Sequence, residues 1–161
     1  GAEYGKTLAL VDHEGHPRTL EDFRGKVVMV FFGFTQCPDV CPLTLVKAAE
    51  VRRLLGDEGK ELQVILVSLD PERDSQEVLG PYVTAFDPSF IALRGDLAQT
   101  QAAAREFRVF YQKVPNRDGT SYTIDHTAAS YIIDPQGQLR LFVKHSQEPA
   151  EIAADIRQLL G

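Results

Sequence analysis

A continuous apolar run and a second apolar strand, separated by one helix-length segment, constrain the fold of this 161-residue chain more than any other feature. The runs VVMVFF at 27–32 and LQVILV at 62–67 are typical of strands that are buried on both faces. The segment 42–55 predicts a helix of about four turns between them, with Gly56 as its C-terminal cap. A strand, a helix and a strand in this order predict a parallel pair joined by a right-handed crossover.

The rest of the chain adds short strands, hairpins and three further helices around this unit. A short hairpin with its turn at 14–17 is predicted at 8–20, and a short strand at 91–93. Two further pairs of strands are predicted at 109–124 and 129–143, with turns at 116–119 and 134–137. Helices are predicted over 75–86 with Ser75 as N-cap, from Asp96 to about 107, and at the C-terminus, where Ile152, Ile156, Leu159 and Leu160 share one face. A parallel strand–helix–strand unit, an antiparallel hairpin and a closing helix together predict a thioredoxin-like α/β sandwich, with a central mixed β-sheet flanked by helices and an N-terminal β-hairpin.

The composition indicates one globular domain over residues 1–161 and argues against a nucleic-acid partner. Apolar residues make up 43% of the chain and charged residues 25%, close to globular averages. Seventeen Lys and Arg against 23 Asp and Glu give a net charge of -6, whereas a nucleic-acid binder usually has a basic face. The longest nearly unbroken apolar run, 27–34, is too short to cross a bilayer as a helix.

The two cysteines of the chain, Cys37 and Cys41, lie in GFTQCPDVCP at 33–42. This segment follows the first buried strand, and open α/β sheets bind ligands at such strand ends. A residue that precedes proline is biased away from helical angles, so both cysteines are expected to be non-helical, with Pro42 as the first helical residue. The helix N-terminus should favour a thiolate at Cys41. Two cysteines this close indicate a metal site or a redox pair rather than a structural cross-link.

A nitrogen ligand and a carboxylate are expected near the cysteines. His126 directly precedes the strand at 129–133, which in a thioredoxin-like sheet passes beside the cysteine loop. Two Cys and one His suit Cu(I), or Cu(II) with an extra oxygen ligand, and zinc competes for such a set. Asp70 closes the second parallel strand and should emerge at the same edge, as a weak ligand or as a hydrogen-bond partner of a ligand. The alternative for Asp70 is a turn-initiating residue before Pro71.

Three blocks in order, GKVVMVFFGFTQCPDVCP, VSLDPERD and DHTAASYIIDPQG, resemble the Sco/SenC family of copper chaperones. These are relatives of thioredoxins and peroxiredoxins that serve assembly of the CuA site of cytochrome c oxidase. The resemblance implies that Cys37, Cys41 and His126 bind one copper ion per chain, and that Asp70 lies near it. It implies as partners the CuA-bearing oxidase subunit and a copper donor protein. It also implies a domain in the bacterial periplasm, or alternatively the mitochondrial intermembrane space, tethered through a membrane anchor that is absent from these residues.

Two other functions compete with a copper-delivering assembly factor, which would not be a turnover enzyme. A thiol–disulfide oxidoreductase would use Cys37 and Cys41 as a redox-active pair to reduce the CuA-site cysteines or to act in redox signalling. Thioredoxin-type enzymes place two residues between their cysteines and this chain places three, which favours metal. A peroxidase is the third candidate, but Thr35 and Gln36 do not supply the expected surroundings of its thiolate. His13 and His16, spaced as a possible metal pair, are better explained as solvated turn residues.

Overall fold

The computed structural model describes residues 3–161, so Gly1 and Ala2 of the predicted domain lie outside the described residues. Seven strands form one mixed sheet in the order β2-β1-β5-β4-β3-β8-β9, and β6 and β7 form a separate two-stranded sheet. The strands are β1 (Ala9–Asp12), β2 (Pro17–Thr19), β3 (Val27–Gly33), β4 (Leu62–Ser68), β5 (Ile91–Arg94), β6 (Tyr111–Pro115), β7 (Tyr122–His126), β8 (Ala129–Ile133) and β9 (Leu139–Lys144). The α-helices are α1 (Val40–Leu54), α2 (Gln76–Thr84), α3 (Leu97–Glu106) and α4 (Pro149–Leu160), and Leu20–Phe23 and Gly56–Glu61 are 3₁₀ turns.

The predicted strand–helix–strand unit is confirmed and forms the centre of the fold. Strands β3 and β4 pair in parallel, every residue of both is buried, and α1 connects them. Gly56 follows the end of α1 with a φ of 60°, a left-handed conformation that a residue without Cβ adopts at little cost. Burial on both faces explains why the residues of these two strands are nearly all apolar rather than alternating between apolar and polar.

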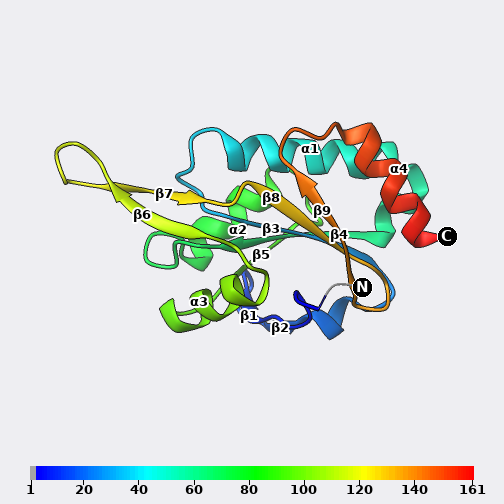
Figure 1. Cartoon of the computed structure of the whole chain (residues 1–161), viewed down its shortest axis with the longest axis horizontal. Coiled ribbons are helices and arrows are strands. Elements are labelled where there is room, and N and C mark those ends of the chain that lie inside the picture. Colours follow the sequence, from blue (N-terminus) through cyan, green and yellow to red (C-terminus); the bar gives the residue numbers. More distant parts are fainter. Residues whose placement is uncertain (1–2) are drawn as a thin grey trace.

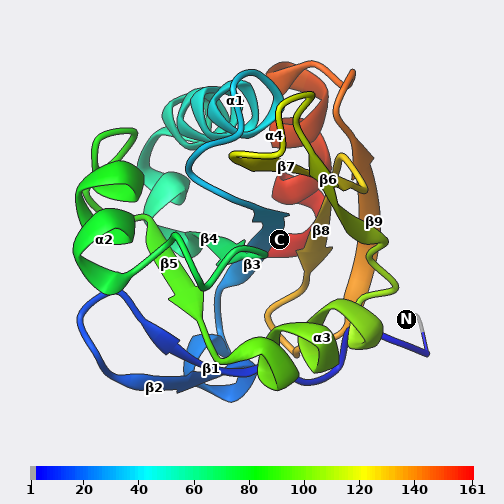
Figure 2. The same cartoon turned by 90° about the vertical axis from the view of Figure 1, so that its left-hand side faces the viewer.

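Helices cover both faces of the sheet, as the thioredoxin-like prediction requires. Helices α1 and α4 pack together on one side, and α3 lies on the opposite side against β1 (Figures 1 and 2). The predicted hairpin of β8 and β9 is antiparallel, and β8 also pairs with β3. The side chains of Ser75 and Asp96 cap α2 and α3 as expected.

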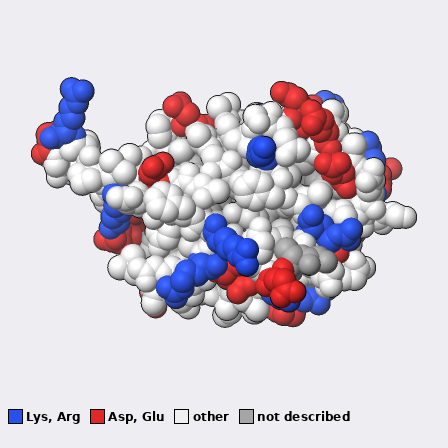
Figure 3. Space-filling model, viewed as in Figure 1, with Lys and Arg blue, Asp and Glu red and all other residues white. Residues whose placement is uncertain are grey.

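The β6–β7 hairpin extends away from the rest of the molecule (Figure 1). Most of its side chains are exposed, with Ile124 the buried exception in β7. Charged side chains of both signs lie at its tip and over the face shown in Figure 3. The base of the hairpin lies beside the loop that joins β3 to α1 (Figure 2), so the fold brings the segment of His126 to the cysteines.

Two predicted boundaries are wrong. Helix α1 begins at Val40 rather than at Pro42, so Cys41 is helical. Pro42 is then the third residue of the helix. Backbone N–H groups in the first turn have no intrahelical acceptor, so a proline there costs the helix no hydrogen bond. The bias against helical angles at Cys41, the residue before the proline, is therefore overcome. The N-terminal turn lies at 13–16 rather than 14–17, because the buried Asp12 carboxylate accepts hydrogen bonds from the backbone N–H groups of Glu14 and His16.

No helix within residues 3–161 combines the length and the apolar character that crossing a membrane demands.

Candidate metal centre

Three soft donors from distant parts of the chain meet at one end of the sheet. One ligand atom each of Cys37, Cys41 and His126 lies within 4.8 Å of the other two. The Cys41 Sγ is 3.7 Å from His126 Nε2, and the Cys41 N–H donates to Cys37 Sγ at 3.4 Å. Both cysteines are free thiols in the structure. Metal–sulfur and metal–nitrogen bonds of about 2.0–2.3 Å place ligands up to roughly 4.6 Å apart, so the three donors fit a single ion after small adjustments.

His126 already has the tautomer that a metal ligand needs. Its Nδ1 lies 3.1 Å from the carbonyl oxygen of Thr127, and because a carbonyl only accepts, Nδ1 must carry the proton. The lone pair is therefore on Nε2, the nitrogen that faces Cys41. Burial lowers the pKa of His126, which keeps the imidazole neutral and able to bind a cation.

The phenylalanines of β3 and its following loop define the orientation of this ring. Phe31 and Phe34 are buried, as expected for core residues, and each also lies edge-on to His126 with ring centroids 6.0 and 5.9 Å away. Aromatic residues of a buried strand are mostly core residues, and only the three-dimensional structure shows the contact of these two with the histidine.

Cys41 is a buried thiol rather than the thiolate expected from the helix N-terminus. Its sulfur is covered on all sides, and this burial raises the pKa of Cys41 well above its usual range, with a further increase from the neighbouring Cys37. Desolvation of a charged sulfur thus outweighs the favourable effect of the helix end in the metal-free protein. A metal ion would have to displace the proton of this thiol.

Asp70 lies close to the sheet edge but is not among the gathered donors. Its buried carboxylate accepts hydrogen bonds from the Tyr122 hydroxyl at 2.7 Å and from Arg73 Nε at 2.5 Å. Its carbonyl accepts from the backbone N–H groups of Arg73 and Asp74, as in the turn that Asp-Pro favours. These contacts favour the structural interpretation of Asp70 over direct ligation.

Asp74 is a buried carboxylate of the site region that sequence reasoning missed. It accepts hydrogen bonds from the Thr35 backbone N–H at 3.1 Å, the Thr35 hydroxyl at 2.6 Å and the Ser68 hydroxyl at 2.8 Å. Burial raises the pKa of Asp74 although these hydrogen bonds oppose the shift. The carboxylate fixes the loop before Cys37 to the end of β4. In the sequence, the only indication of a second carboxylate at the site is an Asp four residues after Asp70.

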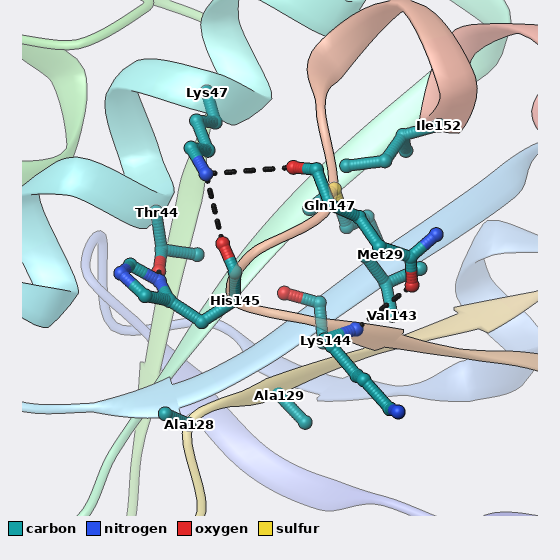
Figure 4. A pocket seen from close by; sticks show the side chains of 11 residues that line it. Met29, Thr44, Lys47, Ala128, Ala129, Val143, Lys144, His145, Gln147 and Ile152 are labelled. Atoms are coloured by element: carbon teal, nitrogen blue, oxygen red, sulfur yellow. Dashed lines mark hydrogen bonds between the residues drawn. The ribbon is translucent and has the colours of Figure 1, made fainter.

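The remaining histidines have structural surroundings. Nδ1 of His13 accepts from the Ala92 N–H, and His16 is exposed near Asp12, so the structure does not bring the predicted turn pair into a metal-binding group. His145 lies beside Thr44, and Lys47 donates to the carbonyl oxygens of His145 at 2.8 Å and Gln147 at 3.4 Å (Figure 4). The cavity there measures about 10 Å³, room for one water molecule. These bonds attach α1 to the loop before α4.

The fold and the donors define a thioredoxin-like protein with a Cys₂His site suited to soft metal ions. Its whole length, residues 1–161, matches the sequence model of the SCO1/SenC family. The chain belongs to this family.

Relatives and solved structures agree with this assignment. A mouse protein named SCO2 homolog, mitochondrial, is 37% identical over 94% of this chain and 60% of its own length, and the SCO2-like protein RP587 of Rickettsia prowazekii is 34% identical over 88% of this chain and 68% of its own. The chain spans only 54–60% of the mammalian relatives it matches first. The structure of Bradyrhizobium japonicum ScoI with copper bound has a TM-score of 0.88 at 38% identity, with 98% of this chain and 99% of that chain covered. Yeast Sco1 with copper bound also has a TM-score of 0.88, at 31% identity over 98% of this chain and 88% of that chain.

Proposed function

We propose that this chain is a copper-binding metallochaperone that takes up one copper ion through Cys37, Cys41 and His126 and delivers it to the CuA site of cytochrome c oxidase. The observation that carries the proposal is the meeting of two thiols and a neutral imidazole nitrogen within 4.8 Å. Soft thiolate and imidazole ligands suit Cu(I). Copper is bound in the structures of similar proteins from Bradyrhizobium and yeast, which favours copper over zinc.

Delivery would proceed by ligand exchange with the receiving protein. The partly exposed Cys37 is the accessible sulfur, whereas Cys41 is buried behind it, so an incoming ligand would reach the ion from the Cys37 side. The proposed partners are the CuA-bearing oxidase subunit and a copper donor protein. The proposed location is the bacterial periplasm, with the protein tethered to the membrane and residues 1–161 forming one folded domain.

A thiol–disulfide oxidoreductase remains the second candidate because both cysteines are free and adjacent. In that reaction the two thiols would form a Cys37–Cys41 disulfide and transfer two electrons and two protons to a partner disulfide. This chemistry needs both sulfurs but not His126.

Anaerobic copper titration of the reduced protein, with metal quantified after desalting, tests the proposal. We expect one copper per chain in the wild type and sharply lower retention in Cys37→Ser, Cys41→Ser and His126→Ala alike. His16→Ala, a histidine remote from the thiols, is the matched control and should retain copper. Equal retention in the wild type and His126→Ala would remove His126 as a ligand. Disulfide-reducing activity that survives in His126→Ala but not in the cysteine variants would then favour the oxidoreductase.

A further inference from the structure

The strand that carries His126 is not part of the seven-stranded sheet. Within residues 3–161, strand β7 pairs only with β6, in a sheet of their own. Along β7, Tyr122 and His126 are half-buried, Ile124 is buried, and the residues between them are exposed. Backbone pairing with the central sheet therefore does not determine which face of β7 is turned toward the thiols. Side-chain contacts must determine it.

Tyr122 is held at three points by two residues of the loop that follows β4. Its hydroxyl donates to Asp70 Oδ1 at 2.7 Å, and Arg73 Nη1 donates to its backbone carbonyl at 2.8 Å. The Arg73 guanidinium carbon also lies 3.7 Å from the centroid of the Tyr122 ring, a cation–π geometry. Arg73 Nε in turn donates to Asp70 Oδ2 at 2.5 Å. We call Asp70, Arg73 and Tyr122 the Tyr122 clamp.

The clamp acts on the same face of β7 as the metal site. Residues i, i+2 and i+4 of a strand share one face, so Tyr122, Ile124 and His126 point to the same side. At about 3.3 Å per residue, Tyr122 is roughly 13 Å from His126 along the strand. A shift of β7 by one residue would turn this entire face outward, His126 included. Fixing Tyr122 therefore fixes the side to which His126 points.

We propose that Asp70, Arg73 and Tyr122 are positioning residues that hold the β6–β7 hairpin so that His126 Nε2 faces Cys41. The consequence for metal uptake rests on the proposed function, whereas the placement of the His126 ring does not. In this role Asp70 acts on the metal site through β7 and not as a ligand.

The clamp is more deeply buried than the other ion pair at this junction, that of Lys113 and Glu72, although Lys113 Nζ also lies 4.7 Å from the centroid of the Tyr122 ring. The Asp70 side chain is fully buried and that of Arg73 is 17% exposed, whereas Lys113 and Glu72, which also join β6 to this loop, are 49% and 51% exposed. Exposed pairs contribute little and are screened by salt. Loss of one partner from a buried ion pair leaves the charge of the other partner buried and without an opposite charge beside it. The clamp, and not the Lys113–Glu72 pair, is therefore expected to control the hairpin.

The first test uses the metal-free, reduced protein. Tyr122→Phe removes only the hydroxyl, and Arg73→Gln removes the ring and carbonyl contacts, while Glu72→Gln is the matched control on the same loop. We expect the His126 ring-proton NMR shifts, which Phe31 and Phe34 perturb in the wild type, to move toward random-coil values in both clamp variants. Amide exchange in β7 should accelerate at least tenfold, with β3 and β4 unchanged. Wild-type His126 shifts in both clamp variants would overturn the proposal, as would an equal effect of Glu72→Gln.

The second test uses copper. In the Cu(II)-loaded wild type, electron paramagnetic resonance should show nitrogen hyperfine coupling from His126, and the thiolate-to-copper absorption should be present. Both clamp variants should keep the absorption while the nitrogen coupling weakens and copper retention falls about tenfold. Full nitrogen coupling in these variants would refute the positioning role. A wild type that takes up no copper would refute the proposed function instead, and the clamp would still be decided by the metal-free NMR experiment.

Discussion

Gly33, the last residue of β3, leaves the space that the Cys41 sulfur occupies. A Cβ atom at this position would lie 2.7 Å from Cys41 Sγ and 2.8 Å from Phe31 Cε1. The φ angle of Gly33 is not in the left-handed region, so its backbone accepts any L-residue. The substitution Gly33→Ala therefore tests the close approach of the Cys41 sulfur and of the Phe31 ring without adding backbone strain.

The magnitude of the effect follows from these distances. Opening the contact from 2.7 Å to the 3.4 Å of an ordinary van der Waals contact requires a movement of at least 0.7 Å. Overpacking of this kind costs about 1–3 kcal/mol in a well-packed core. Metal sites tolerate deviations of only about 0.2 Å in their bond lengths, so we expect a more than tenfold loss of copper affinity in addition to the loss of stability.

Urea unfolding of the reduced, metal-free protein measures the first effect, and competition with a copper chelator measures the second. A double-mutant cycle isolates the sulfur contact: in a Cys41→Ala background, Gly33→Ala should cost less free energy of unfolding than it does in the wild type. The same cost in both backgrounds, together with wild-type copper affinity in Gly33→Ala, would refute the reasoning.

Two further predictions concern the metal-free protein. Burial lowers the pKa of His126 below its usual 6.5, so below pH 6.5 the unfolded state binds more protons than the folded state. The contribution of the neutral His126 to the free energy of unfolding should therefore be fully present above pH 6.5 and should decrease as the pH falls below that value. His126→Gln should reduce this fall between about pH 7.5 and pH 5.5 in urea unfolding, and an unchanged pH dependence would contradict the assignment. Arg108 follows Phe107, the C-cap of α3, and has a φ of 56°. This conformation costs a non-glycine residue about 1–2 kcal/mol, while the Arg108 guanidinium over the Tyr4 ring returns about 0.5–1 kcal/mol. Arg108→Gly should thus raise the unfolding free energy by up to about 1 kcal/mol, and a destabilised variant would show that the stacking dominates.

The parts of the fold that local sequence determines were predictable. Apolar runs identify β3 and β4 because burial on both faces makes these strands apolar at nearly every position, with Gln63 and Ser68 of β4 as buried polar exceptions. Ser75 and Asp96 identify helix starts because the side chain of each accepts a hydrogen bond from the backbone N–H three positions ahead. Cys37, Cys41 and His126 could be connected because the start of β8, which follows His126, lies beside the end of β3, which precedes the two cysteines.

The features that depend on contacts between distant segments were not predictable in the same way. Asp74 is important because Thr35 and Ser68 converge on it, and a DPERD sequence does not reveal either partner. Asp70 was expected near the metal because it ends a parallel strand, but Tyr122, 52 residues later, takes its carboxylate instead. The predicted first residue of α1 was also wrong, because a proline in the first turn of a helix neither ends the helix nor delays its start.

The protonation state of the metal-free site reconciles the buried thiol with a role for the helix N-terminus. Burial raises the pKa of Cys41 and lowers that of His126, and both shifts remove charge from the buried part of the site. A divalent ion that replaces the protons of both thiols leaves the loaded site with no net charge, whereas a monovalent ion leaves it with one negative charge. Cys41 lies in the first turn of α1, where the free backbone N–H groups stabilise a negative charge. The helix N-terminus therefore acts on the loaded site rather than on the free thiol, and under the proposed function it would favour retention of Cu(I).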